Sequence, residues 1–243
     1  MILNSSSLSK CLSMLVYGED GSGKTKFWLT APGKIRVFNF DRKPEAWWEP
    51  YLVKGIDHEQ VVGYKQEAPL NGETDEKMIA KIKDKNSEIM EKFFQSLESA
   101  WKSSAFSTIV IDNGTEVNSV NKLAEFGKVS KIMPTDYPAL RNTLRRMTNL
   151  ASQYGAKNFI ITCEENEKYA GNKGTGIMKQ DMDKTIRHAS NVILHMTKKL
   201  EDNTIHFKAV MEKCTLNNDL VGMELDGDNG EIEFDVLHEL IFG

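Results

Sequence analysis

A lysine and a hydroxyl residue, Lys24 and Thr25, follow a glycine-rich stretch and are the clearest candidates for chemistry in the sequence. The stretch reads Gly-Glu-Asp-Gly-Ser-Gly-Lys-Thr over residues 18–25. The apolar run before it, residues 12–17, predicts a buried strand, and a short amphipathic segment after it ends at Pro32-Gly33. This strand–loop–helix order is the context in which Gly-x4-Gly-Lys-Thr binds phosphate groups.

Each residue type in this loop has a physical role in binding phosphate. Glycine lets the backbone adopt positive φ and point successive N–H groups at phosphate oxygens, and the next helix adds its positive N-terminus. Lys24 can reach the β- and γ-phosphates, and the Thr25 hydroxyl can ligate Mg2+. The alternative is a glycine-rich turn that matches by chance, and the flanking elements argue against it. We therefore predict an ATP and Mg2+ site at Gly18, Glu19, Asp20, Gly21, Ser22, Gly23, Lys24, Thr25 and Lys26.

A second candidate for chemistry is Asp112, which ends the β-branched, apolar segment 106–112. This is the form of a Walker B strand, which places a carboxylate beside the Mg2+ of the phosphate loop. The alternative is an ordinary buried strand that happens to end in aspartate. Because the segment lies downstream of a phosphate loop, with a helix and a strand between them, we assign Asp112 to the metal site together with Thr25.

Composition sets the limits on the kind of protein. The chain has 243 residues, of which 40% are hydrophobic and 27% charged, which suits one α/β domain with a real core. The net charge of −4 does not by itself indicate nucleic-acid binding. The three cysteines lack metal-ligand spacing, and the apolar runs are shorter than a membrane span. We expect a soluble, cytoplasmic protein without a signal peptide.

The remaining pattern alternates strands with helices. Strands are expected at 35–40, 61–64 and 157–162, and a hairpin at 191–196 and 205–211. Helices are expected at 44–53, at 89–101 after a cap at Asn86 or Ser87, at 114–126, at 135–154 and at 234–242. Two polar stretches are interpreted as a surface excursion, 66–86, and a mobile loop, 165–185.

This alternation predicts an α/β fold: a three-layer P-loop NTPase with a mostly parallel, RecA-like central sheet and helices on both faces. We interpret residues 1–243 as a single domain of this kind. In the RecA-like arrangement the strand at 158–162 lies between the phosphate-loop strand and the Asp112 strand.

Several motifs make the chain resemble the phage AAA-family, RecA-like nucleotide-binding proteins, a group that includes the Sak-type recombination ATPases. The motifs read Tyr-Gly-Glu-Asp-Gly-Ser-Gly-Lys-Thr, Val-Phe-Asn-Phe-Asp, Ile-Val-Ile-Asp-Asn and Asn-Phe-Ile-Ile-Thr-Cys-Glu-Glu, and the resemblance covers about residues 12–242. The chain departs from the family at Asn113, where serine is frequent, and at Cys163, where histidine is frequent. The resemblance implies an ATPase of DNA recombination, replication or single-strand annealing. It also implies a homo-oligomeric ring or filament, with single-stranded DNA and a phage single-strand-binding protein as partners.

The resemblance also implies catalytic roles. RecA-like enzymes take their water-activating carboxylate from the end of the second strand, which is Asp41 here, with Glu45 in reserve; a helix cap is the alternative role for Asp41. Thr162 and Glu164 either sense the γ-phosphate or merely end their strand. Lys213, the nearest match to a basic residue that closes the late strand, is a candidate for reaching a neighbour's nucleotide; like Lys208, it is otherwise a solvated lysine. We expect Trp47 and Trp48 to pack a helix rather than stack on a base.

Function remains open between three classes at this point. A DNA-dependent ATPase needs a basic, flexible loop, and 165–185 offers Lys168, Tyr169, Lys173 and Lys179. A small-molecule P-loop kinase would favour an arginine-rich lid, and residues 165–185 contain no arginine, so the kinase is the less favoured class. A slow ATPase that organises other proteins is the third class.

Overall fold

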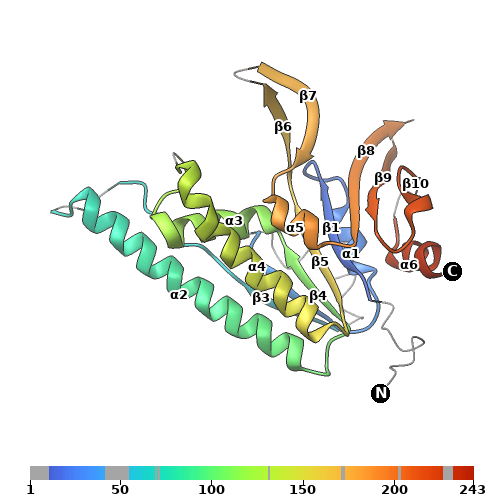
Figure 1. Ribbon diagram of the computed structural model, residues 1–243, viewed down its shortest axis with the longest axis horizontal. Coiled ribbons are helices and arrows are strands. Elements are labelled where there is room, and N and C mark those ends of the chain that lie inside the picture. Colours follow the sequence, from blue (N-terminus) through green and yellow to red (C-terminus); the bar gives the residue numbers. More distant parts are fainter. Residues whose placement is uncertain are drawn as a thin grey trace.

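The computed structural model describes residues 11–41, 55–68, 70, 72–130, 132–170, 173–201, 204–226 and 232–243. The expected helix at 44–53, with Glu45, Trp47 and Trp48, lies outside these residues. The described chain forms an eight-stranded sheet with helices on both faces and a separate two-stranded sheet (Figure 1). This is the α/β architecture of a RecA-like P-loop NTPase, as predicted.

The large sheet contains β1 (Ser13–Gly18), β2 (Ile35–Asn39), β3 (Ile56–Gln60), β4 (Thr108–Asp112), β5 (Asn158–Cys163), β8 (Val192–Glu201), β9 (Thr204–Cys214) and β10 (Glu224–Asp226). Its strand order is β10-β9-β8-β1-β5-β4-β2-β3. Strands β1 to β5 and β8 pair in parallel, whereas β9 pairs antiparallel with both β8 and β10. Strand β5 lies between β1 and β4, which confirms the RecA-like order, and the β8–β9 hairpin is also confirmed.

The helices are α1 (Lys24–Leu29), α2 (Asp75–Lys102), α3 (Gly114–Phe126), α4 (Tyr137–Tyr154), α5 (Lys184–Ala189) and α6 (Phe234–Phe242), with short 3-10 turns at Pro134–Asp136 and Asn218–Leu220. Helices α3, α4 and α6 agree with the sequence prediction. The glycine that ends α4, Gly155, adopts a left-handed conformation and donates its N–H to Ala151 O. None of the helices in the described segments has the length and apolarity to cross a membrane.

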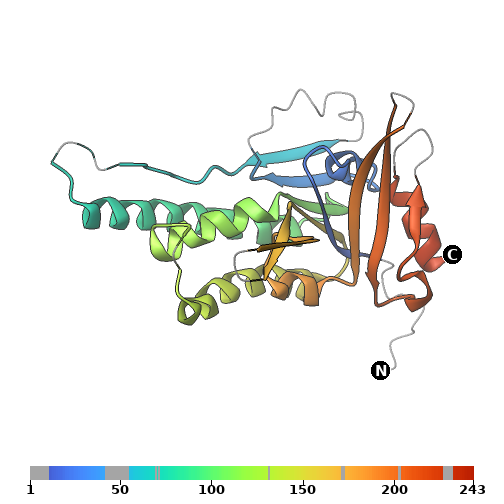
Figure 2. The same ribbon diagram turned by 90° about the horizontal axis from the view of Figure 1, so that it is seen from above.

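Side chains that alternate along β1 divide the core into two clusters. Met14 and Val16 face a cluster that includes α1 and α6. Leu15 and Tyr17 face the other cluster, which buries the apolar faces of α2, α3 and α4. Helices α2, α3 and α4 lie together along one side of the molecule, while α6 lies at the opposite end beside β9 and β10 (Figure 2). The sheet is therefore covered on both faces, as a parallel sheet requires.

The predicted surface excursion at 66–86 is wrong in its second half, because α2 begins at Asp75. Its N-cap is Thr74, whose side chain accepts from Lys77 N, and not Asn86 or Ser87. Asn86 is instead buried inside the helix, where Nδ2 donates to Tyr64 O at 2.9 Å and Oδ1 accepts from Tyr64 N at 3.0 Å. Asn86 thus fixes the extended chain that leaves β3.

The strand expected at 61–64 is also displaced, since β3 spans Ile56–Gln60. This strand is polar, and its pairing rests partly on charge. Arg36 of β2 bonds Asp57 at 2.8 Å and also contacts Glu59. Because β3 contains no apolar run, the hydrophobic pattern of the sequence does not predict it.

The mobile loop predicted at 165–185 is a hairpin and a helix in the structure. Strands β6 (Glu165–Ala170) and β7 (Lys173–Gln180) pair antiparallel as the separate two-stranded sheet. Helix α5 follows, capped by the Asp183 side chain on Thr185 N. The β6–β7 hairpin projects from the edge of the molecule at which β5 ends (Figure 1).

Candidate functional site: the phosphate loop and the Asp112 carboxylate

The phosphate loop turns tightly where β1 ends, and two of its glycines are required sterically. Gly18 has φ of +159°, and a Cβ there would lie 2.0 Å from Met196 O. Gly23, the N-cap of α1, has φ of +92°, and a Cβ there would lie 3.0 Å from the Phe207 ring. Strands β8 and β9 therefore pack against one side of the loop and exclude residues larger than glycine at positions 18 and 23.

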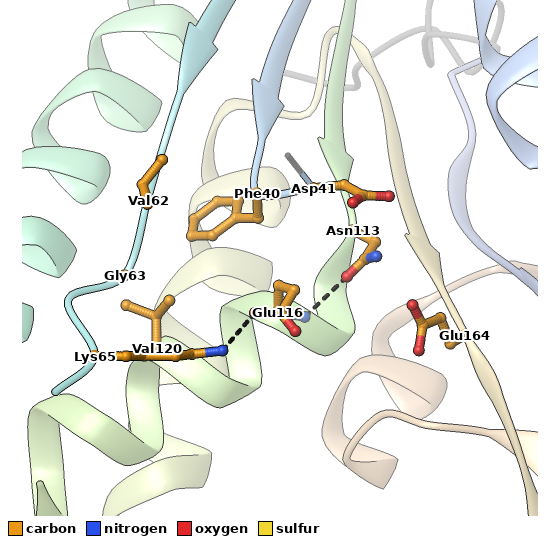
Figure 3. Close-up of a pocket in the computed structure, with 9 residues that line it drawn as sticks. All are labelled: Phe40, Asp41, Val62, Gly63, Lys65, Asn113, Glu116, Val120 and Glu164. Carbon is orange, nitrogen blue, oxygen red and sulfur yellow. Dashed lines mark hydrogen bonds and ion pairs between the residues drawn. The ribbon is translucent and has the colours of Figure 1, made fainter. Parts of the chain in front are cut away.

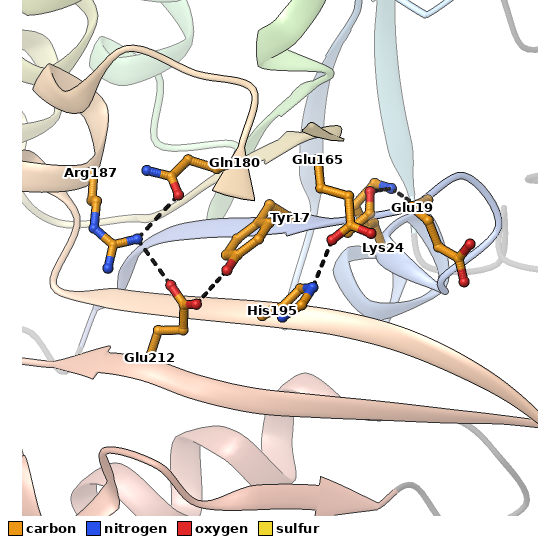
Figure 4. Close-up of polar contacts among 9 residues, drawn as sticks. Tyr17, Glu19, Lys24, Glu165, Gln180, Arg187, His195 and Glu212 are labelled. Atoms are coloured by element: carbon orange, nitrogen blue, oxygen red, sulfur yellow. Dashed lines mark hydrogen bonds and ion pairs between the residues drawn. The ribbon is translucent and has the colours of Figure 1, made fainter. Parts of the chain in front are cut away.

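The donors of the loop fit the phosphates of a nucleotide. Ser22 Oγ is buried and has no hydrogen-bond partner among the described residues. No side chain caps the N-terminus of α1, so its first N–H groups point toward the loop without intrahelical partners. Lys24 Nζ folds back over the loop and donates to Gly18 O at 2.8 Å and Glu19 O at 2.7 Å (Figure 4). Since all of these groups are donors, anionic oxygens are the natural ligand.

Asp112 is held by three donors, one from β5 and two from α1. Thr162 Oγ1 of β5 donates to Oδ1 at 2.6 Å, and Trp28 Nε1 of α1 donates to Oδ2 at 3.0 Å. Thr25 Oγ1 donates to the same Oδ2 at 3.3 Å. The side chains that the sequence assigned to Mg2+, Thr25 and Asp112, are thus neighbours. A hydroxyl and a carboxylate are hard oxygen ligands of the kind that Mg2+ uses.

Sheet register explains why these residues meet. Ile111 of β4 is paired with Ile161 of β5, so Asp112 and Thr162 stand side by side one residue further on. Trp28 is fully buried and lies three residues after Thr25, which places both side chains on one face of α1. The sequence analysis missed Trp28. The spacing from Thr25 was a signal, but its contact with β4 depends on the tertiary fold.

A cavity of about 300 Å³ opens at the ends of β2, β4 and β5, and Asn113, the residue after Asp112, lines it (Figure 3). Asp41, Asn113 and Glu164 line it from these three strand ends. Asp41 N donates to Asp112 O at 3.2 Å, which fixes the chain just after β2. Asn113 Oδ1 accepts from Glu116 N at 2.8 Å and so caps α3. Two predicted residues, Asp41 and Glu164, are therefore brought to one cavity.

Burial and the neighbouring charges set the direction in which the pKa of Glu164 shifts. Partial burial raises the pKa of the Glu164 carboxyl above its usual value, although the side chain still reaches solvent. The Lys24 ammonium opposes this rise in pKa, whereas the negative charge of Asp41 adds to it. A carboxyl group with a raised pKa in a cavity is a candidate for proton transfer.

A polar network behind the loop joins β1 to the β6–β7 hairpin (Figure 4). Tyr17 Oη donates to Glu212, and Arg187 donates both to Glu212 at 3.0 Å and to Gln180 of β7 at 3.2 Å. Burial, and then the bond to Glu212, raise the pKa of Tyr17, so the phenol stays protonated.

A stacked pair makes a second link to the same hairpin. The His195 ring lies parallel to the Tyr17 ring, with centroids 4.5 Å apart, and His195 Nε2 lies 2.7 Å from Glu165 Oε2 of β6. Sequence reasoning missed this network because its members are scattered from residue 17 to residue 212 and form no motif.

The two late lysines have partners inside the chain. Lys213 Nζ donates to the carbonyl oxygens of Arg187 at 3.0 Å, His188 at 3.1 Å and Ser190 at 2.5 Å. It therefore closes the C-terminal end of α5, and its burial lowers the pKa of the ammonium. Lys208 Nζ pairs with Asp226 Oδ1 of β10 at 3.2 Å. The role of Lys213 toward a neighbouring subunit stays a prediction.

The residues predicted to contact DNA lie on the β6–β7 hairpin. Lys168 and Tyr169 belong to β6, and Lys173 and Lys179 belong to β7. Lys179 is exposed and is paired in register with Asn166. Ile177 and Met178 are also exposed on β7, at 54% and 41%. The hairpin thus presents both a cation and apolar side chains to solvent.

The sheet order, the glycine loop and the contact between Thr25 and Asp112 define a P-loop NTPase of the RecA-like type. Residues 10–219 match the AAA domain family, and the chain belongs to that family. Membership indicates an ATPase that binds and hydrolyses ATP. Comparison with curated proteins found no match.

Proposed function

We propose that this protein is a Mg2+-dependent ATPase that acts on single-stranded DNA in phage recombination, replication or annealing. The observation that carries the ATPase part is the Asp112 carboxylate, held by Thr25, Trp28 and Thr162 beside the phosphate loop. Support for the phage DNA part is the sequence resemblance, together with the hairpin that leaves β5 at the same edge.

In this proposal, different residues bind the phosphates, hold the metal and activate the attacking water. Bound Mg-ATP supplies the γ-phosphoryl group that is transferred to water, and the metal neutralises the charge of the phosphates. Lys24 and the loop N–H groups hold the phosphates, while Thr25 and Asp112 hold the metal. Thr162 and Trp28 keep the Asp112 carboxylate in one orientation. Asp41, in the adjacent cavity, orients and deprotonates the attacking water.

The β6–β7 hairpin is our proposed DNA contact. A single residue, Glu164, separates the end of β5 at Cys163 from the start of β6 at Glu165. Thr162, the partner of Asp112, therefore lies three residues from the hairpin. Lysines on the hairpin supply phosphate contacts, Tyr169 supplies a stacking surface, and assembly into a ring or filament aligns successive hairpins along the strand.

Steady-state ATP hydrolysis, measured with and without single-stranded DNA, tests this proposal. We expect Mg2+-dependent turnover that rises when DNA is added, and none in Lys24→Ala, which removes the phosphate-binding cation but no part of the core. Slow turnover that DNA leaves unchanged would favour the assembly ATPase, with no DNA role. Transfer of the γ-phosphate to a small-molecule acceptor instead of water would show a kinase.

A further inference from the structure

Phe207 of β9 lies directly against the phosphate loop. A Cβ on Gly23 would lie 3.0 Å from Phe207 Cδ1, so the ring touches the backbone at the start of α1. Lys26 Nζ lies 5.3 Å from the centroid of the same ring. The cross-strand partner of Phe207 is Lys198, and Lys198 Nζ donates to Asp20 O at 2.7 Å. Phe207 and Lys198, which are cross-strand partners in the β8–β9 hairpin, therefore both contact the phosphate loop.

The topology sets the direction in which a nucleotide must lie on this loop. Strand β1 has β5 and then β4 on one side, and β8 and then β9 on the other. Asp112 ends β4 and contacts Thr25, so the reacting end of a triphosphate lies on the β5–β4 side. The nucleoside is joined to the opposite end of the triphosphate and therefore extends toward β8 and β9, where Phe207 lies.

We propose that Phe207 is the platform on which the purine base of the nucleotide stacks. This rests on the proposed function, because it needs the loop to bind a nucleoside triphosphate. The phenyl ring is half-buried by the loop and keeps surface for a planar partner. Aromatic rings attract bases by offset stacking, and a purine offers more area than a pyrimidine. The Lys26 side chain is long and flexible, so a base can displace its ammonium from the ring.

A purely structural role for Phe207 makes a different prediction. If the ring only supports Gly23, its loss disturbs the loop and weakens every phosphate ligand equally. If the ring binds the base, its loss weakens ATP more than inorganic tripolyphosphate, which has the same phosphates and no base. The ratio of the two affinities therefore separates the two roles without any measurement of activity.

The experiment is calorimetric titration of Mg-ATP and of Mg-tripolyphosphate into wild type and Phe207→Ala. We expect the preference for ATP over tripolyphosphate to fall about 10-fold in Phe207→Ala, from the usual contribution of base stacking. The control is His206→Ala, whose side chain lies on the opposite face of β9, and it should keep the preference. An unchanged preference in Phe207→Ala would overturn the proposal.

A second variant covers the case in which Phe207→Ala fails to fold. Phe207→Trp keeps an aromatic face and adds a fluorescent reporter. Its preference for ATP should match that of wild type, and ATP should quench its emission where tripolyphosphate does not. Equal quenching by both ligands would overturn the proposal. Failure of wild type to bind either ligand would instead overturn nucleotide binding itself, which is a distinct result.

Discussion

Trp28 Nε1 donates to Asp112 Oδ2 across 3.0 Å, so an indole on the phosphate-loop helix holds the carboxylate that ends β4. Thr25 donates to the same oxygen from one turn earlier in α1. Helix α1 has only six residues, yet two of them bond the metal-site carboxylate. The loop and the carboxylate are therefore positioned as one unit, and movement of α1 is expected to move both.

Trp28→Phe tests this relationship, because phenylalanine keeps most of the buried ring and removes the N–H donor. We expect turnover at limiting Mg2+ to fall by about 10- to 100-fold, the usual effect of losing a group that orients a metal ligand. Nucleotide binding measured without metal should change little. Phe27→Leu, a change at the neighbouring buried ring, is the control for lost packing. Identical Mg2+ dependence in Trp28→Phe and wild type would show that the indole does not position Asp112.

Asp41→Asn tests the identity of the general base. We expect hydrolysis to fall by about 100- to 10,000-fold with ATP affinity nearly unchanged, because a base acts on water and not on the bound nucleotide. Single-turnover rates and equilibrium binding measure the two quantities separately. Survival of activity within a few-fold would remove Asp41 from this role.

Glu164 lines the same cavity and is the comparison for Asp41. Because burial raises the pKa of Glu164 above the usual 4.5, a Glu164 base would act only above that raised pKa. The turnover rate would then rise with pH over a range above the usual pKa of a glutamate carboxyl, and Glu164→Gln would lose this rise. If Asp41 is the base, the rise of the turnover rate with pH should persist in Glu164→Gln.

The sequence predicted the parts of this site that local motifs and element order determine. The glycine loop and Asp112 follow from motif spacing and element order, and the position of β5 between β1 and β4 follows from the RecA-like arrangement that these motifs indicate. Trp28 could not be assigned in the same way, because an apolar tryptophan on a short helix has the pattern of a core residue. Its contact with Asp112 depends on how α1 packs against β4. The network of Tyr17, Glu212 and Arg187 depends on tertiary structure for the same reason.

Besides β3, the β6–β7 hairpin and the first turns of α2 escaped prediction because they lack an apolar pattern. The β6–β7 hairpin stands away from the core, so its strands carry polar residues and glycines on both faces and read as a loop. The first turns of α2 extend beyond the body of the protein, and Ile82 is the first buried residue among them. Hydrophobic periodicity identifies a helix or strand by the face that it buries. These segments form helix and strand but bury few side chains, so the periodicity does not reveal them.

Lys213→Met tests whether this lysine acts within its own chain. Methionine keeps the length of the side chain and removes the donor to three carbonyl oxygens at the C-terminal end of α5. We expect the free energy of unfolding to fall by about 1–2 kcal/mol, since partly buried carbonyl oxygens lose a charged donor. Chemical denaturation measures this change. Unaltered stability combined with lost turnover only in the assembled protein would instead support a role toward a neighbour's nucleotide.

The lysines of the hairpin provide a test of DNA contact. Replacing Lys168, Lys173 and Lys179 together by alanine should weaken single-stranded DNA binding and reduce the salt dependence of affinity. Each phosphate contact to a single strand contributes roughly 0.7 to the slope of log affinity against log salt, so the slope should fall by about two. Binding titrations at several salt concentrations measure the slope.

A charge-matched control for this triple variant lies on α2. Lys77, Lys83 and Lys92 are exposed on that helix, away from the edge that carries the phosphate loop. Their replacement by alanine changes the net charge equally and should leave the slope close to that of wild type. Equal slopes in the hairpin variant and wild type would place any DNA elsewhere, and the α4 arginines, Arg141, Arg145 and Arg146, would then be examined.

The measurement that tests the central claim most directly is ATP turnover as a function of Mg2+ concentration in wild type and Asp112→Asn. The account assigns Asp112 to the metal, directly or through water, and predicts that the variant needs far more Mg2+ and turns over far more slowly. Nucleotide binding without metal should be similar in the two proteins. The same Mg2+ dependence and the same rate in both would contradict the account, because Asp112 would then lie outside the working site.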